Sequence, residues 1–250
     1  MAAKTRKPLL PSPSAAGWSH AAIAAALGGE ILSGALPPGS RLPAVEEMNA
    51  RFGVSRVVVR EVVKTLTAKG LVVSKTKVGT IVRDAAAWNW LDAEVLEWRV
   101  RAGLDRAFLE QIAAVRSAIE PAAAALAARH RTAGDLARLR ACIAAMSAAE
   151  GDTARYAEAD VAFHLALGRA SGNPLVGSFG PVIKVALRGL IALSAAGVKE
   201  MESGHGGSTR RHAAIVEAIA ARDESRARAA MQAVIARGSK HAGRRLRGKR

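Results

Sequence analysis

Three side chains in the C-terminal half combine metal-ligand chemistry with helical spacing. Asp160 and His164 stand four residues apart in a helical pattern, on a stripe that also carries Phe163 and Leu167, so both point to the same side. His212 lies on the apolar face of a later helical pattern. Two imidazoles and one carboxylate form a donor set that suits Zn²⁺ or another divalent transition metal. The spacing therefore makes these three residues candidate metal ligands.

An arginine accompanies these candidates. Arg116 lies among Ile112 and Val115 on an apolar helix face, and a buried guanidinium facing the cluster suits a carboxylate ligand that accepts two hydrogen bonds. Two simpler interpretations remain open. A single histidine on an apolar face is more often a hydrogen-bonded core residue than a ligand. Asp160 could also pair with Arg116 and need no metal, because a buried carboxylate requires only a cation of some kind.

Helices are expected to position these side chains, because the chain is rich in alanine. Half of its 250 residues are hydrophobic and only 4% are aromatic, and alanine is the strongest helix former. Glycine, proline and aspartate separate the periodic segments. The predicted helices are 92–101, 105–130, 133–149, 153–171, 174–196, 208–221 and 224–237, with Gly204, Gly206 and Gly207 in a flexible loop. These patterns indicate a mainly α protein whose C-terminal half is an all-α helical bundle.

The N-terminal part of the chain follows a different pattern. Gly53 separates two short helical patterns, as in a helix-turn-helix. Ser55 is placed to N-cap the second helix, and Gly70 is free to take the left-handed conformation just past its end. Two β-rich runs, 71–75 and 79–83, follow. The sequence therefore predicts a helix-turn-helix followed by a two-stranded wing.

Basic side chains lie on one side of this predicted unit. Arg56, Arg60 and Lys64 recur every four residues beside the apolar stripe of the second helix. An arginine near the start of a recognition helix can donate two hydrogen bonds to guanine in the major groove. The wing lysines, Lys75 and Lys77, would lie near the adjacent backbone or minor groove. The pattern indicates DNA binding, and a small α+β domain with a solvated basic face is the alternative.

Charge is concentrated at the two ends of the chain. The net charge is +16; residues 1–84 contain 12 Lys and Arg against 5 Asp and Glu, and residues 237–250 contain 7 basic and no acidic residues. This distribution suits a polyanionic partner. The single cysteine, Cys142, excludes an intramolecular disulfide and fits a reducing compartment. No apolar run approaches the roughly 18–20 residues of a membrane helix, so we expect a cytoplasmic protein without a membrane partner.

The N-terminal motifs resemble the DNA-binding domain of GntR-family bacterial transcription regulators. The resemblance covers roughly residues 18–84 and rests on ILSGALPPG at 31–39, Leu42-Pro43, Val54-Ser55-Arg56, Val59-Arg60-Glu61, Leu66 and Gly79-Thr80. It implies operator binding through Ser55, Arg56, Arg60, Lys75, Lys77 and Gly79. The chain departs from the family at Glu46, where some members carry a DNA-contacting arginine, and at Lys77-Val78, which replaces the usual Gly-Arg of the wing tip. These departures bear on the operator sequence and not on the DNA-binding role.

The C-terminal motifs resemble the FCD effector domain of the FadR subfamily over roughly residues 92–237. The shared motifs are Val115-Arg116, Glu120-Pro121, Asp160-x-x-Phe163-His164, Ser171-Gly172-Asn173-Pro174 and His212-x-x-Ile215. In many such domains one Asp and three His hold a metal that contacts a carboxylate effector. The resemblance implies that Asp160, His164 and His212 hold a divalent metal such as Zn²⁺. The fourth position is Val234, so binding would be weak and completed by ligand or water. Arg116 and Asn173 match positions that line the family's effector pocket.

A narrower match points to the effector. The run 88–92, WNWLD, is similar to the joint found in galactonate-operon repressors of this family, which makes a sugar acid such as D-galactonate the expected effector. The resemblance implies a homodimer that represses a sugar-acid catabolic operon and leaves its palindromic operator when the small carboxylate binds. It does not imply an enzyme. A metal-dependent enzyme acting on a small carboxylate and a non-specific DNA-binding protein are the alternatives.

These patterns divide the chain into five segments. Trp88, Trp90 and Trp98 cluster after the wing and predict either an interface between domains or a local core patch. The segments are a disordered N-terminal arm at 1–17, a winged helix-turn-helix domain at 18–84, a Trp-rich linker at 85–91, an all-helical effector-binding and dimerisation domain at 92–237, and a basic, disordered tail at 238–250.

Overall fold

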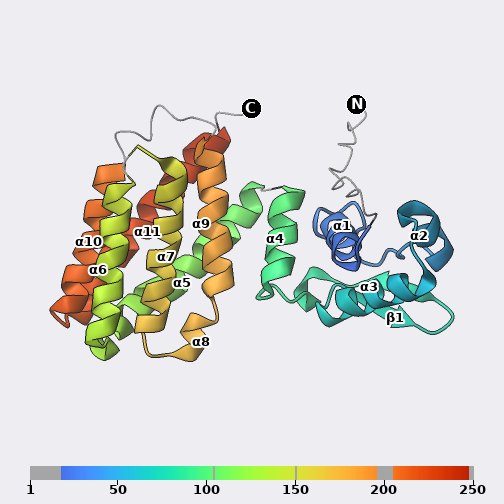
Figure 1. Cartoon of the computed structure of the whole chain (residues 1–250), viewed down its shortest axis with the longest axis horizontal. Coiled ribbons are helices and arrows are strands. Elements are labelled where there is room, and N and C mark those ends of the chain that lie inside the picture. Colours follow the sequence, from blue (N-terminus) through green and yellow to red (C-terminus); the bar gives the residue numbers. More distant parts are fainter. Residues whose placement is uncertain (1–17, 104, 150, 196–204, 248–250) are drawn as a thin grey trace. The chain divides into compact units, whose positions relative to one another are not determined.

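The protein contains two compact units, shown in the computed structural model of Figure 1, which describes residues 18–103, 105–149, 151–195 and 205–247. The first unit extends from Met1 to Leu104 and the second from Asp105 to Arg250. The N-terminal unit contains α1 (His20–Leu32), α2 (Val45–Phe52), α3 (Arg56–Ala68), β1 (Val72–Lys75), β2 (Gly79–Val82), a short 3-10 helix η1 (Ala85–Ala87) and α4 (Ala93–Ala102). No helix among the described residues has the length and hydrophobicity that a membrane crossing requires.

Helices α2 and α3 form the expected helix-turn-helix. Gly53 ends α2 with φ of 65°, a left-handed conformation that glycine adopts without steric cost. The Ser55 side chain caps α3 by accepting a hydrogen bond from the Val58 backbone N–H at 3.5 Å. Gly70 follows α3 with φ of 75°. Both predicted caps of this helix are therefore confirmed.

The wing follows α3 as an antiparallel hairpin. Strands β1 and β2 pair in a register that runs from Val72 opposite Val82 to Lys75 opposite Gly79, and an isolated bridge joins Arg41 to Ile81. The turn places Lys77 at φ of 60°, a conformation that few non-glycine residues adopt. The two-stranded wing is confirmed, and its tip holds a lysine in a left-handed conformation.

Helix α4 belongs to the N-terminal unit, which corrects the expected domain boundary between residues 91 and 92. Val95 and Trp98 of α4 are buried in the same hydrophobic cluster as the helix-turn-helix. Trp98 lies against Gly28 of α1 so closely that a Cβ at that glycine would be 2.2 Å from Trp98 Cε3. The apolar face of α4 therefore extends the core of the DNA-binding unit.

The tryptophans of the joint contribute to this same core. Trp88 and Trp90 pack against the N-terminal cluster, with their rings 5.4 Å apart. Each indole N–H finds a backbone carbonyl at 2.9 Å, that of Arg83 for Trp88 and that of Ala85 for Trp90. Of the two interpretations of the tryptophan cluster, the structure shows the local core patch.

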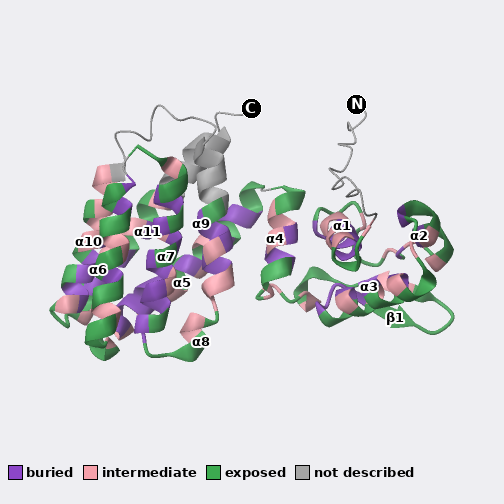
Figure 2. Cartoon of the chain, viewed as in Figure 1, coloured by how far each residue is buried: buried purple, intermediate pink, exposed green. Residues whose placement is uncertain are grey.

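The C-terminal unit is all-helical throughout its described residues, as predicted. It contains α5 (Arg106–His130), α6 (Ala133–Ala148), α7 (Thr153–Ala170), α8 (Pro174–Gly177), α9 (Gly180–Ala195), α10 (His205–Ala220) and α11 (Glu224–Arg247). Figure 2 shows buried residues along the inward faces of α5, α6 and α7. The largest fully buried side chains of this core include Leu139, Met146, Phe163, Ile215, Ile219 and Met231. Because α7 is buried along much of its length, polar residues on it are removed from water.

Two of the predicted helices have other boundaries in the structure. The helix expected over 174–196 is divided into α8 and α9, because Pro181 lacks the N–H that a continuous helix would use and is tolerated only in a first turn. Helix α10 begins at His205, so Gly206 and Gly207 are helical rather than part of a loop, whereas Gly204 lies outside the described residues.

The C-terminal tail is also helical where the structure describes it. Helix α11 continues to Arg247, so the tail expected to be disordered from residue 238 extends the last helix. The segment 238–247 contains Lys, Ala, Arg and Leu and no proline, and two glycines alone do not end a helix. The expected arm at 1–17 and residues 248–250 lie outside the described residues.

Candidate metal centre and DNA-binding surface

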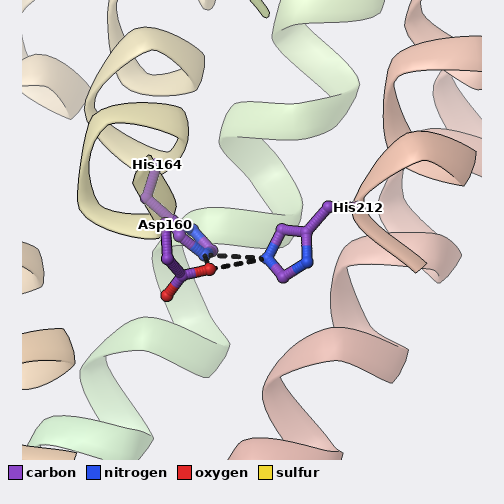
Figure 3. A group of neighbouring side chains, drawn as sticks. All are labelled: Asp160, His164 and His212. Atoms are coloured by element: carbon purple, nitrogen blue, oxygen red, sulfur yellow. Dashed lines mark hydrogen bonds and ion pairs between the residues drawn. The ribbon is translucent and has the colours of Figure 1, made fainter. Parts of the chain in front are cut away.

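Two helices bring the three candidate ligands together. Asp160 and His164 lie one turn apart on α7, and His212 faces them from α10, as Figure 3 shows. The Oδ1 atom of Asp160 is 3.1 Å from His212 Nε2 and 3.8 Å from His164 Nε2, and the two Nε2 atoms are 3.4 Å apart. Both histidines are buried, and the Asp160 side chain is 13% exposed. The cluster is therefore nearly removed from solvent.

In each imidazole, the hydrogen-bond partner of Nδ1 determines whether Nε2 presents a lone pair to the cluster. His212 Nδ1 is 2.9 Å from the carbonyl oxygen of Ser208, which can only accept, so Nδ1 carries the proton. His164 Nδ1 lies 2.5 Å from Glu120 Oε2, at ion-pair distance although without hydrogen-bond geometry, and a carboxylate favours a proton there too. Each neutral ring then directs an Nε2 lone pair at the Asp160 carboxylate. Three acceptors that face one another in this way form a candidate cation site.

A divalent transition metal fits this arrangement. A tetrahedral Zn²⁺ site with bonds of about 2.0–2.1 Å has ligand atoms roughly 3.3 Å apart, close to the three separations observed. His164 and His212 also have the outer partners, a carboxylate and a carbonyl, that metal-bound histidines use to fix their orientation. This is the one group of potential ligands at metal-binding distance in the described part of the chain. Val234, the expected fourth position, is a partly buried apolar residue packed against the core, so it supplies no ligand atom.

Arg116 pairs with Glu120 rather than with Asp160. Its Nε donates to Glu120 Oε1 at 2.5 Å and its Nη2 to Oε2 at 3.4 Å, one turn along α5. Both side chains are almost fully buried, at 5% and 2% exposure. Burial acts to raise the pKa of Glu120, but its contacts with His164 and Arg116 outweigh it and lower the pKa to about 2. Among the described residues, Asp160 therefore has His164 and His212 as its direct partners rather than Arg116.

Glu120 is the residue of this site whose role the sequence reasoning missed. In the sequence it stands only as part of the Glu120-Pro121 motif. The spacing of four residues on one helix was the signal that it would pair with Arg116. Asn173, by contrast, is placed apart from this network of contacts: it is exposed, its Oδ1 accepts from the backbone N–H groups of Leu175 and Val176, and it caps α8.

The candidate DNA-binding residues are exposed on α3 and the wing. Arg56 Nη2 is 3.2 Å from Glu46 Oε1, and Lys64 pairs with Glu61 at 2.7 Å. Among the described residues, Arg60, Lys75 and Lys77 have no ion-pair partner. Ser55 and Gly79 shape the backbone at the start of α3 and of β2. Unpaired, exposed cations on a recognition helix and a wing suit contact with DNA phosphates and bases.

Comparisons with known proteins match both units. The model for bacterial regulatory proteins of the gntR family matches residues 20–82, and the model for the FCD domain matches residues 111–237. A solved structure of Lar, which controls the expression of the Listeria monocytogenes agr system, has the same fold with a TM-score of 0.62 and 24% identity, over 91% of this chain and 98% of that one.

Two curated relatives from Escherichia coli (strain K12) are transcription regulators. The uncharacterized HTH-type regulator YieP is 38% identical over 63% of this chain and 69% of its own length. The galactonate operon transcriptional repressor is 36% identical over 62% of this chain and 67% of its own length. These matches show that the chain belongs to the GntR family of bacterial regulatory proteins, as a transcription regulator with an FCD domain and not an enzyme.

Proposed function

We propose that this regulator is a cytoplasmic, metal-dependent repressor of a sugar-acid catabolic operon, and that a small carboxylate such as D-galactonate releases it from its operator. The observation that carries the proposal is the buried convergence of Asp160, His164 and His212, with Arg116 attached to the same network through Glu120. The 36% identity to the galactonate operon repressor supports the choice of effector.

Asp160, His164 and His212 would hold the metal through one oxygen and two nitrogens. When bound, the metal would supply a concentrated positive charge and open positions for effector oxygens. Arg116 would donate to the effector carboxylate, because its guanidinium is buried, fixed by packing and suited to a planar anion. Asn173 would contribute only if its side chain left the cap of α8.

The signal would reach the DNA through the chain itself. Arg116 lies on α5, which follows α4 in sequence, and α4 is part of the core of the DNA-binding unit. A movement of α5 on effector binding would therefore be passed to the recognition helix α3. In a homodimer the two recognition helices must match half-sites about 34 Å apart, so small rotations disturb both contacts. A coupling of ~1–3 kcal/mol would lower operator affinity roughly 5- to 150-fold.

Fluorescence anisotropy on duplex DNA from upstream of the chain's own reading frame tests this function. At fixed salt we expect selective binding that D-galactonate reverses, and that L-lactate, a smaller hydroxy acid, reverses less. Arg116→Ala should keep the DNA affinity and lose the release. Selective binding that no aldonate reverses would refute the effector, and equal binding to any duplex would favour a non-specific DNA-binding protein.

A further inference from the structure

The buried carboxylate of Glu120 contacts both Arg116, the proposed effector-binding arginine, and His164, a proposed metal ligand. Glu120 is 2% exposed; its Oε1 accepts from Arg116 Nε at 2.5 Å, and its Oε2 lies 2.5 Å from His164 Nδ1. Arg116 shares helix α5 with it, whereas His164 comes from α7. The same group therefore touches the arginine proposed for the effector and a histidine proposed for the metal, without being placed to bind either ligand itself.

We propose that Glu120 is a positioning residue that couples metal binding to effector binding: it holds His164 with Nε2 toward the metal, and it occupies Arg116 until an effector carboxylate displaces it. The inference rests on the proposed function and adds to it a group that neither ligand touches. It assigns Glu120 two effects of opposite sign, one on each ligand.

On the histidine side, Glu120 favours metal binding. A carboxylate at Nδ1 keeps the proton on that nitrogen, leaves the Nε2 lone pair facing Asp160 and His212, and makes the imidazole a stronger ligand. Loss of such an outer partner typically weakens metal binding about 10- to 100-fold. Neutralising Glu120 should therefore weaken the site although all three ligands remain.

On the arginine side, Glu120 opposes anion binding. Glu120 accepts hydrogen bonds from Nε and Nη2 of Arg116. An incoming carboxylate therefore meets a guanidinium whose charge Glu120 already balances. Displacement exchanges one buried carboxylate for another and leaves Glu120 with His164 alone. By reciprocity, an effector that frees Glu120 for His164 raises metal affinity, and a bound metal that draws Glu120 toward His164 raises effector affinity.

Glu120→Gln tests both effects on the full-length protein. Zn²⁺ affinity is measured by competition with a chromophoric chelator, and D-galactonate affinity by calorimetry on Zn-free protein. We expect Zn²⁺ binding to weaken about 10- to 100-fold and D-galactonate binding to tighten about threefold or more. Glu110→Gln is the matched control, because Glu110 forms the same four-residue pair with Arg106 on α5 but both side chains are 63% exposed. It should change neither affinity.

Because Zn²⁺ binding should weaken while D-galactonate binding tightens, the two measurements distinguish a positioning role of Glu120 from a general loss of structure. A Glu120→Gln protein that loses both affinities, or neither, overturns the proposal. If the wild-type protein binds no D-galactonate in either its Zn-free or its Zn-loaded form, the proposed effector is wrong, and the Zn²⁺ titration decides on Glu120: an unchanged Zn²⁺ affinity in Glu120→Gln overturns its role. Should Glu120→Gln fail to fold by circular dichroism, Glu120→Asp keeps the charge but is too short to bridge both partners. Unaltered Zn²⁺ binding in that variant would equally overturn the inference.

Discussion

Replacing Lys69 by methionine tests whether a buried ion pair ties the recognition helix to α4. Lys69 is the C-cap residue of α3, and its side chain is only 9% exposed. Its Nζ donates to both carboxylate oxygens of Asp92 at 2.9 Å, lies 2.7 Å from Glu94 Oε2 and sits 5.2 Å from the centre of the Trp98 ring. Asp92 is also the N-cap of α4. One ammonium group therefore joins the end of α3 to the start of α4.

The expected cost follows from the exposure of each partner. Breaking a fully buried pair costs about 3–5 kcal/mol. Here Asp92 is 25% exposed and Glu94 60% exposed, so water can solvate both carboxylates once the lysine is gone. Methionine retains most of the apolar stem, and Asp92 keeps its capping hydrogen bonds. We therefore expect a loss of about 2 kcal/mol, in the range for hydrogen bonds to charged groups.

Tryptophan fluorescence during urea unfolding measures this loss in the full-length protein, because all four tryptophans lie in the N-terminal unit. Lys64→Met is the control: Lys64 pairs with Glu61 at 2.7 Å on the same helix, but the side chains are 72% and 52% exposed. Exposed pairs contribute about 0–1 kcal/mol. Equal shifts of the unfolding midpoint in the two variants would refute the reasoning that burial gives the Lys69 pair its strength.

Three further predictions concern the DNA surface, the metal and pH. Arg56→Ala should cost about 1–3 kcal/mol at the operator and relax base preference in anisotropy titrations, whereas an equal loss on random duplexes would make Arg56 a phosphate contact only. His212→Ala should abolish the Zn²⁺-induced rise in melting temperature seen by calorimetry; a retained rise would place the metal elsewhere. Burial acts to raise the pKa of Asp92, but Lys69 and the backbone N–H groups of Val95 and Glu94 outweigh it and lower that pKa, so the unfolded state binds more protons. The stability of the N-terminal unit should therefore fall below about pH 4, and Lys69→Met should lose much of that dependence.

Features fixed by neighbouring residues could be predicted from the sequence. The cap at Ser55 and the left-handed turn at Gly70 depend on atoms within a few residues, so residue type alone indicates them. The same holds for Asp160 and His164, whose spacing places them on one face of any helix. The metal site needed more than spacing, because the approach of His212 from α10 depends on helix packing that spacing does not specify.

The sequence predictions failed where tertiary packing determines the structure, or where one residue type is compatible with two structures. Trp98 fits either domain by composition, and only its contact with α1 assigns α4 to the N-terminal unit. A proline marks a helix start as readily as it interrupts a helix, and here Pro181 stands in the first turn of α9. The pairing of Glu120 with Arg116 follows from their spacing. Its contact with His164 requires the crossing of α5 and α7, which no local pattern reveals.

The contact between Gly28 and Trp98 has an evolutionary consequence. A Cβ at position 28 would lie 2.2 Å from Cε3 and 2.6 Å from Cζ3 of the rigid Trp98 indole. A side chain at position 28 and a tryptophan at position 98 would therefore occupy the same space. A homologue that carries alanine at 28 should carry a smaller side chain at 98, and one that keeps tryptophan should keep glycine. The two substitutions should therefore covary across the family although 70 residues separate them, and a chimaera that joins α1 of one relative to α4 of another should fold only when both members of the pair come from compatible parents.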